Sequence, residues 1–342
     1  MKRAILVVTS AGLGLRLKEY SFKKYGKYLD KPLVKLKGKT LLEWSIKPFY
    51  PLITAGILNF SDIYIVIRED QNEKQFREVI IRINKKINII KIEKLSRGPA
   101  HTAYEACKKI SKVRSIKKLT LIVSDSDHTF RSDSLINFLK NNKKRKNNAF
   151  CTLKSVANPE KWGYVIKNEN KQLISGEKDI LSKDKSTQNA AEFLIGCYLY
   201  HDMDTLKKAI IEFDKSKFKL SESHHSLVLS LLSKSHSVST INSNWGLGLG
   251  TPLQLEKAEN SLISFEGNRE PSTYIIDIDG VIFHHDKGRF SESGDFVNNP
   301  KPINNNKELI NDLYDYGSYI VLFSSRPETS YEKTNNDLKN IG

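Results

Sequence analysis

Residues 4–16 read Ala-Ile-Leu-Val-Val-Thr-Ser-Ala-Gly-Leu-Gly-Leu-Arg, an apolar run followed by a turn with two glycines and an arginine. Its apolar run, Ala4–Val8, predicts a buried strand rather than a signal peptide, because the run is short and charged residues follow soon after it. A glycine-containing turn from Ser10 to Arg16 comes next. Glycines let the backbone approach an anion closely, and the freed N–H groups and the arginine can bind its oxygens. Such turns also serve simply to leave a strand, and the motif alone favours that plainer interpretation.

Outward from this stretch, short apolar runs alternate with amphipathic segments. The expected strands are Ala4–Val8, Ile63–Ile67, Ile87–Ile90 and Leu119–Val123, with expected helices at Thr40–Pro48, Glu73–Ile83 and Ala100–Ile110. This alternation is typical of βαβ units and of a largely parallel sheet. Shorter runs at Phe150–Leu153, Gly163–Ile166 and Phe193–Tyr200 predict a mixed-sheet region, followed by helices at Met203–Phe213 and Ser223–Leu232. The fold class is therefore α/β, with a mixed, mostly parallel sheet.

The length of the chain indicates two domains. At 342 residues it exceeds the size at which one hydrophobic core stops growing. A polar segment at 263–272, which contains Gly267, Asn268 and Pro271, is typical of a linker. We expect a large domain at 1–262 and a small α/β domain at 273–342.

The charge of the chain does not decide its function class. The formal net charge of +16 comes mostly from lysines spread along the chain, and the short run Lys143–Lys146 is typical of a solvated helix end or loop. A positive field attracts triphosphates and sugar phosphates as well as nucleic acid, and we expect no nucleic-acid partner.

Composition predicts a cytoplasmic protein. No run approaches the roughly 18 apolar residues of a membrane helix, so we expect no membrane partner. The cysteines Cys107, Cys151 and Cys197 lie far apart, without the spacing of a zinc site or a disulfide framework.

A second motif carries a family resemblance. Asp30-Lys31-Pro32-Leu33-Val34 precedes Gly38-Lys39-Thr40, and with the first turn it resembles the nucleotidyltransferases that make nucleotide sugars, the family of glucose-1-phosphate thymidylyltransferase. Asp30 stands where that family has proline. The resemblance implies a Rossmann-like domain in which the turn holds a nucleoside triphosphate and Lys31 neutralises charge at the α-phosphate. The matching residues of the turn are Ala11, Gly12, Gly14 and Arg16.

Later motifs follow in the order of that family. Leu95–Ala103 resembles its base-reading loop, which implies nucleotide contacts at Gly98, Pro99 and Thr102. A helix that begins with a proline in its first turn is the structural alternative, and both can hold. Asp125 and Asp127 come just past the end of an apolar strand, where ligands of α/β sheets bind.

The resemblance makes Asp127 the aspartate that binds Mg²⁺, with Asp125 as its neighbour, although an Asx-type turn also explains Asp125. His128 has no partner in view, and we expect no role for it.

The acceptor would bind further along the chain. By resemblance, Gly163, Glu177 and Lys178 contact a sugar phosphate, although Glu177 and Lys178 in isolation would be an ordinary exposed turn. Glu192–Tyr200 resembles the strand that closes the acceptor pocket.

One motif departs from the family. In Trp245–Pro252, Gly248 occupies the position of the second metal aspartate. Either Asp127 and substrate phosphates hold the metal alone, or a nearby residue such as Asn244 compensates.

The C-terminal part resembles the start of a haloacid-dehalogenase phosphatase. Tyr274–Ile282 is an apolar strand that ends in Asp277-Ile278-Asp279-Gly280. The resemblance implies a nucleophile at Asp277, an acid/base at Asp279, and a metal site at both. Ser324, after a second apolar strand, would bind phosphate. A calcium loop is the weaker alternative, because no acidic loop follows. The family's lysine motif and later acidic pair do not occur before Gly342, so we expect weak or absent phosphatase activity.

The leading hypothesis is an enzyme that couples a nucleoside triphosphate to a sugar phosphate, or a related phosphorylated small molecule, and releases pyrophosphate, with Mg²⁺ as cofactor. The combination of the two domains favours a role in surface polysaccharide or capsule biosynthesis. The alternatives are a phosphatase as the main activity and a catalytically silent nucleotide-binding module. The nucleobase, the acceptor and the oligomeric state, with a homo-oligomer among the options, stay open.

Overall fold

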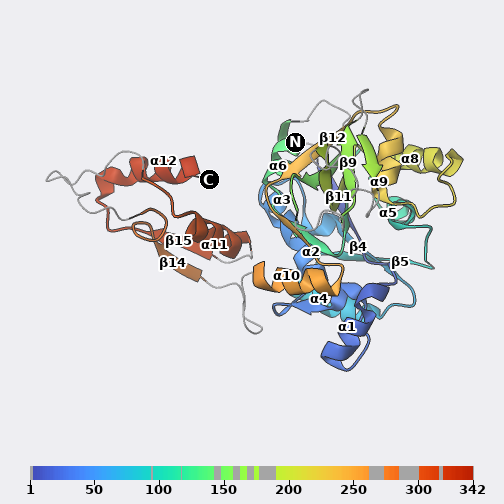
Figure 1. Ribbon diagram of the computed structural model, residues 1–342, viewed down its shortest axis with the longest axis horizontal. Coiled ribbons are helices and arrows are strands. Elements are labelled where there is room, and N and C mark those ends of the chain that lie inside the picture. The colour runs from blue at the N-terminus through green and yellow to red at the C-terminus, as the bar shows by residue number, and fades with distance from the viewer. Residues whose placement is uncertain are drawn as a thin grey trace. The chain divides into compact units, whose positions relative to one another are not determined.

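The computed structural model describes residues 3–93, 95–116, 118–141, 148–156, 162–167, 173–176, 190–261, 273–284, 300–315 and 319–341. The chain divides into two compact units, Met1–Ser261 and Leu262–Gly342 (Figure 1). Among the described helices, none combines the length and the apolar character that crossing a bilayer requires.

A parallel sheet forms the centre of the first unit. Its four strands lie in the order β6, β1, β4, β5, and they span Thr120–Asp125, Ala4–Thr9, Ile63–Arg68 and Asn88–Ile92. β1 lies between two parallel neighbours, with Leu6 opposite Ile122 and Ile63. Because both faces of such a sheet are covered, its strands are apolar almost throughout.

Antiparallel strands extend this sheet beyond β6. β11 (Glu192–Tyr200) pairs antiparallel with β6, β8 and β9. The remaining strands of this part are β8 (Asn148–Leu153), β9 (Tyr164–Lys167), β10 (Leu173–Gly176) and β12 (Val238–Ser243). The register of β11 against β8 shifts between Leu194 and Tyr198, which marks a bulge around Gly196. The predicted α/β class with a mixed, mostly parallel sheet is confirmed.

Helices cover both faces of the sheet (Figure 1). Alternate side chains of β1 point to opposite faces and pack in two different apolar clusters. Leu6 and Val8 pack in one apolar cluster, and Ile5 and Val7 pack in the other. The first cluster is closed by α2 (Leu41–Ile46), α3 (Tyr50–Thr54), α4 (Glu73–Ile83) and α6 (Asp133–Asn141). The second is closed by α5 (Pro99–Val113), α8 (Met203–Lys215) and α9 (His225–Leu232).

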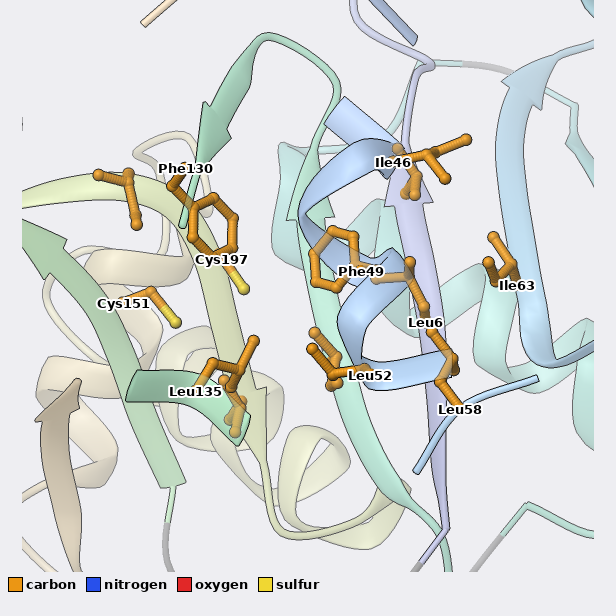
Figure 2. Packing of buried hydrophobic residues seen from close by; sticks show 14 of the residues in the cluster. Leu6, Ile46, Phe49, Leu52, Leu58, Ile63, Phe130, Leu135, Cys151 and Cys197 are labelled. Carbon is orange, nitrogen blue, oxygen red and sulfur yellow. The ribbon is translucent and has the colours of Figure 1, made fainter. Parts of the chain in front are cut away.

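Figure 2 shows the first of these clusters, in which Phe49 and Leu52 lie close to Leu6 of β1. The ring of Phe130 meets Phe49 edge-on, with 5.8 Å between the ring centroids. Cys151 and Cys197 are buried and free at the other side of this cluster. The apolar side chains on this face of the sheet thus form one continuous core.

One helix lies where the sequence pattern predicts no element. α1 spans Leu15–Tyr25 and ends at Gly26, whose N–H donates to the Phe22 carbonyl. This helix is largely exposed, with Leu17 and Ser21 as its buried residues. Its sequence therefore carries little apolar periodicity, which is why the pattern did not predict it.

The second unit contains a small parallel sheet of its own. β14 (Thr273–Asp277) pairs with β15 (Tyr319–Phe323), and α11 (Asn304–Asp315) connects them in sequence before α12 (Tyr331–Ile341). Ile278, Ile282 and Phe283 form its buried cluster, against which Ile310 and Leu338 pack. The pattern is that of a βαβ unit.

A buried histidine lies between β11 and α9. His225 is almost fully buried, its ring stacks on Tyr198 with 4.8 Å between centroids, and its Nδ1 lies 2.8 Å from the Tyr200 hydroxyl. Burial, with a smaller contribution from His224, lowers the pKa of His225 to about 3. The imidazole is therefore neutral in the folded protein at ordinary pH.

This neutral histidine makes the fold sensitive to acid. The folded-state pKa lies below the unfolded value of about 6.5, so the unfolded chain takes up the proton first as the pH falls. The contribution of the neutral His225 imidazole to the free energy of unfolding is fully present above about pH 6.5. It falls by about 1.4 kcal/mol per pH unit as the pH drops toward 3.

In His225→Asn, an amide oxygen can replace Nδ1 as the acceptor for Tyr200. We expect the stability advantage of the wild type over this variant to shrink by about 2 kcal/mol between pH 6.5 and 5, as measured by urea unfolding. A constant difference over that range would contradict the assignment.

Candidate active site

The turn after β1 is fixed by side chains from the end of β4. Arg68 Nη1 donates to the carbonyls of Ala11, at 2.5 Å, and Gly12, at 3.1 Å. Gln71 Nε2 donates to the carbonyl of Ser10 at 3.2 Å. Asp70 in turn accepts from Arg68 Nε at 2.8 Å. The carbonyls of the turn are therefore held on one side by fixed donors.

The N–H groups of the same turn are left available. Among the described residues, none accepts a hydrogen bond from the backbone N–H of Ala11, Gly12, Leu13 or Gly14. These groups precede the N-terminus of α1, whose first turn carries the exposed Arg16. A row of unpaired N–H groups at a helix N-terminus is a site for phosphate oxygens.

Gly14 joins this turn to Lys31. It adopts the left-handed conformation, with φ of 63°, and a Cβ there would lie 2.7 Å from the Cβ of Lys31. Only glycine meets both demands. Lys31 begins a short 3-10 helix, Lys31–Leu33, and its Nζ lies 2.9 Å from Asp127 Oδ2. The phosphate turn, Lys31 and the end of β6 are thus in contact.

Two aspartates and a histidine gather at the end of β6. One ligand atom from each of Asp125, Asp127 and His128 lies within 4.8 Å of the others. His128 begins β7 (His128–Phe130), and its Nδ1 lies 2.9 Å from Asp127 Oδ1. No role was expected for His128, because the loop histidine had no visible partner in the sequence; the structure supplies that partner.

The two carboxylates differ in their titration. Burial tends to raise the pKa of Asp127, but Lys31 and His128 outweigh it and hold that pKa well below the ordinary range. Burial, followed by the charge of Asp127, raises the pKa of Asp125 to about 6. Asp127 is therefore the permanent anion of the pair.

The bulge in β11 makes room for this group. Gly196 has φ of 66°, and a Cβ there would lie 2.6 Å from His128 Nδ1 and 2.9 Å from Asp125 Oδ2. A side chain at this position would displace both groups. The glycine thus serves the geometry of the site as well as the turn of the strand.

The expected base-reading loop is attached to the segment before α9. Ser223 N–H donates to the Arg97 carbonyl at 2.8 Å, and the Ser223 carbonyl accepts from Ala100 N–H at 3.0 Å. Gly98 packs directly against Ser223, and Ser96 Oγ lies 2.5 Å from Thr102 Oγ1. Pro99 is in the first turn of α5, as expected for a helix start.

An ion-pair network holds the outer side of this loop. Arg97 Nη1 donates to Asp214 Oδ1 at 2.8 Å, and its guanidinium lies over the ring of Phe213 and donates to the Lys219 carbonyl. His101 Nε2 lies 3.4 Å from the same Asp214 oxygen. The sequence offered no signal for these contacts, because the partners are more than a hundred residues apart.

The remaining residues predicted for the first unit are Gly163, Glu177, Lys178 and Gly248. Gly163 lies just before β9, and its carbonyl accepts from Leu194 N–H at 2.9 Å. Glu177 and Lys178, like Lys143–Lys146, lie outside the described residues. β13 (Gly246–Gly248) pairs with β7, and Leu249 N–H donates to the Asp127 carbonyl at 2.6 Å, so the segment that lacks an aspartate at Gly248 adjoins Asp127.

In the second unit, the two predicted motifs meet. Ser324 Oγ lies 3.4 Å from Asp279 Oδ2, and Asp277 ends the neighbouring strand with its side chain exposed. Arg326 was not predicted; its Nε donates to Asp279 Oδ2 at 2.8 Å and its Nη1 to Thr334 Oγ1 at 2.9 Å. Its Nη2 bonds the second oxygen of Asp279, so the expected acid/base is held in a bidentate ion pair.

A family model described as Nucleotidyl transferase matches residues 6–261. The chain therefore belongs to the nucleotidyl transferase family, and the prediction of a nucleotidyltransferase enzyme is confirmed. No curated protein matches the chain.

Solved structures share the fold, each at 16% sequence identity. A nucleoside-diphosphate-sugar pyrophosphorylase from Vibrio cholerae RC9 has a TM-score of 0.58 and aligns over 75% of this chain and 100% of its own. The inositol-1-phosphate CTP transferase from T. maritima has a TM-score of 0.54, over 76% and 96%. A Bacillus anthracis protein assigned as a glucose-1-phosphate thymidylyltransferase, in complex with sucrose, has a TM-score of 0.53, over 75% and 94%.

The role of Arg68 in fixing the turn can be measured with inorganic tripolyphosphate. In Arg68→Lys, one point charge replaces a planar group that bonds two carbonyls and Asp70 at once. We expect tripolyphosphate to bind at least about tenfold more weakly by calorimetry, because a hydrogen bond from a charged group is worth about 1.5–3 kcal/mol. The control is Arg77→Lys, on the exposed face of α4, where Arg77 pairs with Glu73. Equal affinities in the two variants would remove Arg68 from the phosphate site.

Proposed function

We propose that the chain couples a nucleoside triphosphate to a sugar phosphate, or a related phosphorylated acceptor, and releases pyrophosphate. The observation that carries the proposal is the position of the unpaired N–H groups of residues 11–14 next to the Lys31–Asp127 pair. Such a site can hold a triphosphate on backbone donors and present its α-phosphorus to a cation. The solved pyrophosphorylase and CTP transferase with the same fold support this proposal.

The reaction is an in-line displacement at the α-phosphorus. An oxygen of the acceptor phosphate forms the new P–O bond, and the bond to the leaving pyrophosphate breaks. Ala11, Gly12 and Gly14, with Arg16, would hold the β- and γ-phosphates through N–H groups and the guanidinium. Lys31 would offset the negative charge that develops at the α-phosphate. No side chain of the protein needs to act as a nucleophile.

The residues at the end of β6 suit a divalent cation. Asp127 is anionic and Asp125 lies beside it, and Mg²⁺ in proteins typically takes one or two carboxylates plus substrate phosphates. We propose Mg²⁺ as the ion, with Asp127 as its main protein ligand; when bound, it would neutralise the phosphate oxygens and orient them. Lys31 and, after it, His128 hold the pKa of Asp127 low, which keeps this carboxylate anionic.

We propose that Gly98, Pro99 and Thr102 contact the nucleobase and that Gly163, Glu177 and Lys178 contact the acceptor. The rigid attachment of the Gly98 loop to Ser223 supports the first assignment, because a preorganised backbone is what base selection requires. We further propose that the product serves surface polysaccharide or capsule biosynthesis in the cytoplasm, where nucleoside triphosphates are available.

Loss of either member of the Lys31–Asp127 pair tests the mechanism. The nucleotide is first chosen as the one of CTP, UTP, GTP, ATP and dTTP that most raises the melting temperature in the presence of Mg²⁺. With that nucleotide, we expect Asp127→Asn and Lys31→Ala each to lower turnover at least roughly a hundredfold, the scale of one lost electrostatic contact to a transition state. Turnover is measured as pyrophosphate release.

The matched control is Lys35→Ala, which removes an exposed lysine from the nearby β2 strand (Lys35–Leu36). It should leave turnover near that of the wild type. Near-normal release by Asp127→Asn or Lys31→Ala would exclude that residue from the mechanism. Equal melting shifts from all five nucleotides would contradict a base-selective loop.

For the second unit we propose a haloacid-dehalogenase-like domain that does not act as a phosphatase. The contact between Asp279 and Ser324, from motifs at the ends of two paired parallel strands, supports the likeness. The bidentate pair of Asp279 with Arg326 supports inactivity, because both carboxylate oxygens already accept hydrogen bonds and none is positioned to protonate a leaving group. The exposed Asp277 would supply the domain's first metal ligand, and Asp279 would supply a second only when Arg326 is displaced from it.

This second assignment is tested by phosphate release from a panel of sugar phosphates. We expect no release above background from the wild type, and unchanged nucleotidyl transfer in Asp277→Asn. Hydrolysis by the wild type that disappears in Asp277→Asn would overturn the proposal and make Asp277 a working nucleophile.

A further inference from the structure

The amide of Gln254 occupies the space beside Gly248. A Cβ added at Gly248 would lie 2.5 Å from Gln254 Nε2 and 3.3 Å from the ring of Trp162. No side chain fits at position 248 while this amide stays in place. The position where the family resemblance expects a second acidic residue is therefore filled from α10 (Pro252–Ser261) by a neutral group.

The amide is held there by a helix cap. Gln254 N–H donates to Thr251 Oγ1 at 3.2 Å, while Gln254 Oε1 accepts from Gly250 N–H at 3.0 Å and from Thr251 Oγ1 at 3.3 Å. This reciprocal arrangement is a variant of the capping box, in which the third helical residue reaches back to the N–H of Gly250, one residue before the N-cap Thr251. Because Oε1 accepts two hydrogen bonds, Nε2 is the atom that faces Gly248.

The nitrogen of this amide is not used by the cap. Among the described residues, none accepts a hydrogen bond from Gln254 Nε2. Gln254 is half-buried, so two N–H donors remain at a fixed point at the border of the site.

Gly250 places the amide next to Asp127. A Cβ at Gly250 would lie within contact distance of Asp127 Oδ2 and 3.6 Å from Gln254 Oε1, so it stands between the two groups. Leu249 also bonds the backbone of Asp127. Gly248, beside which Nε2 lies, pairs with His128 across β13 and β7, so the Nε2 donors border the same patch as the Lys31–Asp127 pair.

The chemistry of this patch favours an amide over an acid. A capping box accepts glutamate as readily as glutamine. A glutamate at 254, however, would add a third carboxylate close to Asp125 and Asp127, and like charges held close together repel. The amide keeps the cap and presents its two N–H donors beside Gly248.

We propose that Gln254 is a substrate-binding residue whose Nε2 donates to an anionic phosphate oxygen. This inference rests on the proposed function and assigns the position beside Gly248 to a neutral donor. A neutral amide offers a phosphate oxygen a charge-assisted hydrogen bond at the place where the family resemblance expects a carboxylate.

Two variants that both weaken the helix cap separate phosphate binding from helix capping. Gln254→Ala removes the cap and the donors, whereas Thr251→Ala weakens the cap but keeps the amide. With inorganic tripolyphosphate and Mg²⁺ in calorimetry, we expect Gln254→Ala to bind at least about tenfold more weakly, the scale of one hydrogen bond to a charged group. Thr251→Ala should stay within about threefold of the wild type. Equal affinities in these two variants would show that Gln254 serves only the helix.

A third variant tests the position of the amide. Gln254→Glu keeps the shape and the cap but turns a carboxylate toward Asp127, so we expect it to bind Mn²⁺ more tightly than the wild type by electron paramagnetic resonance, without nucleotide. Unchanged Mn²⁺ affinity would overturn the placement. If the wild type itself fails to bind tripolyphosphate or to release pyrophosphate, the proposed function fails; if the wild type does both and Gln254→Ala matches Thr251→Ala, only the inference about Gln254 fails.

Discussion

The ion pair between Lys31 and Asp127 is the interaction on which the rest of the site depends. A buried carboxylate is costly without a counter-charge, and Lys31 supplies it from a segment 96 positions away in the chain. The pair ties the phosphate turn, through Gly14, to the end of β6. Other groups then adapt to it: His128 meets the second oxygen of Asp127, and the backbone of Leu249 bonds its carbonyl. The site is thus assembled around one neutralised anion.

Local sequence patterns were sufficient to predict the strands and helices whose formation depends on residues that are close together in the sequence. The run Ala4–Val8 indicated a buried strand because both faces of a central parallel strand are covered, and Thr40 with Glu43 forms the capping box that starts α2. The exposed α1 escaped prediction, since a helix with few buried residues leaves no apolar period.

The sequence predicted the residues of the candidate site that lie in recognised motifs. Lys31 and Asp127 lie in recognisable motifs, but the side chains that organise them come from other strand ends. Arg68 is the last residue of β4 and belongs to none of the recognised motifs, and its hydrogen bonds to the carbonyls of Ala11 and Gly12 exist only because β4 lies next to β1. Ser223 similarly meets the Gly98 loop from a distant segment. Such contacts depend on the order of strands in the sheet, which a single motif does not encode.

The contact between Gly14 and Lys31 has a consequence for how this chain can vary. The polypeptide leaves the site after Arg16, forms α1, and returns to the same point at Lys31, so both ends of the excursion are fixed while its middle is largely exposed. The first turn of α1 is part of the phosphate site, because it carries Arg16 and the helix N-terminus. The length and composition of the segment after that turn can change through evolution, or be replaced by a short engineered connection, at little cost to the phosphate turn. New surfaces can be added there beside the catalytic centre without rebuilding it.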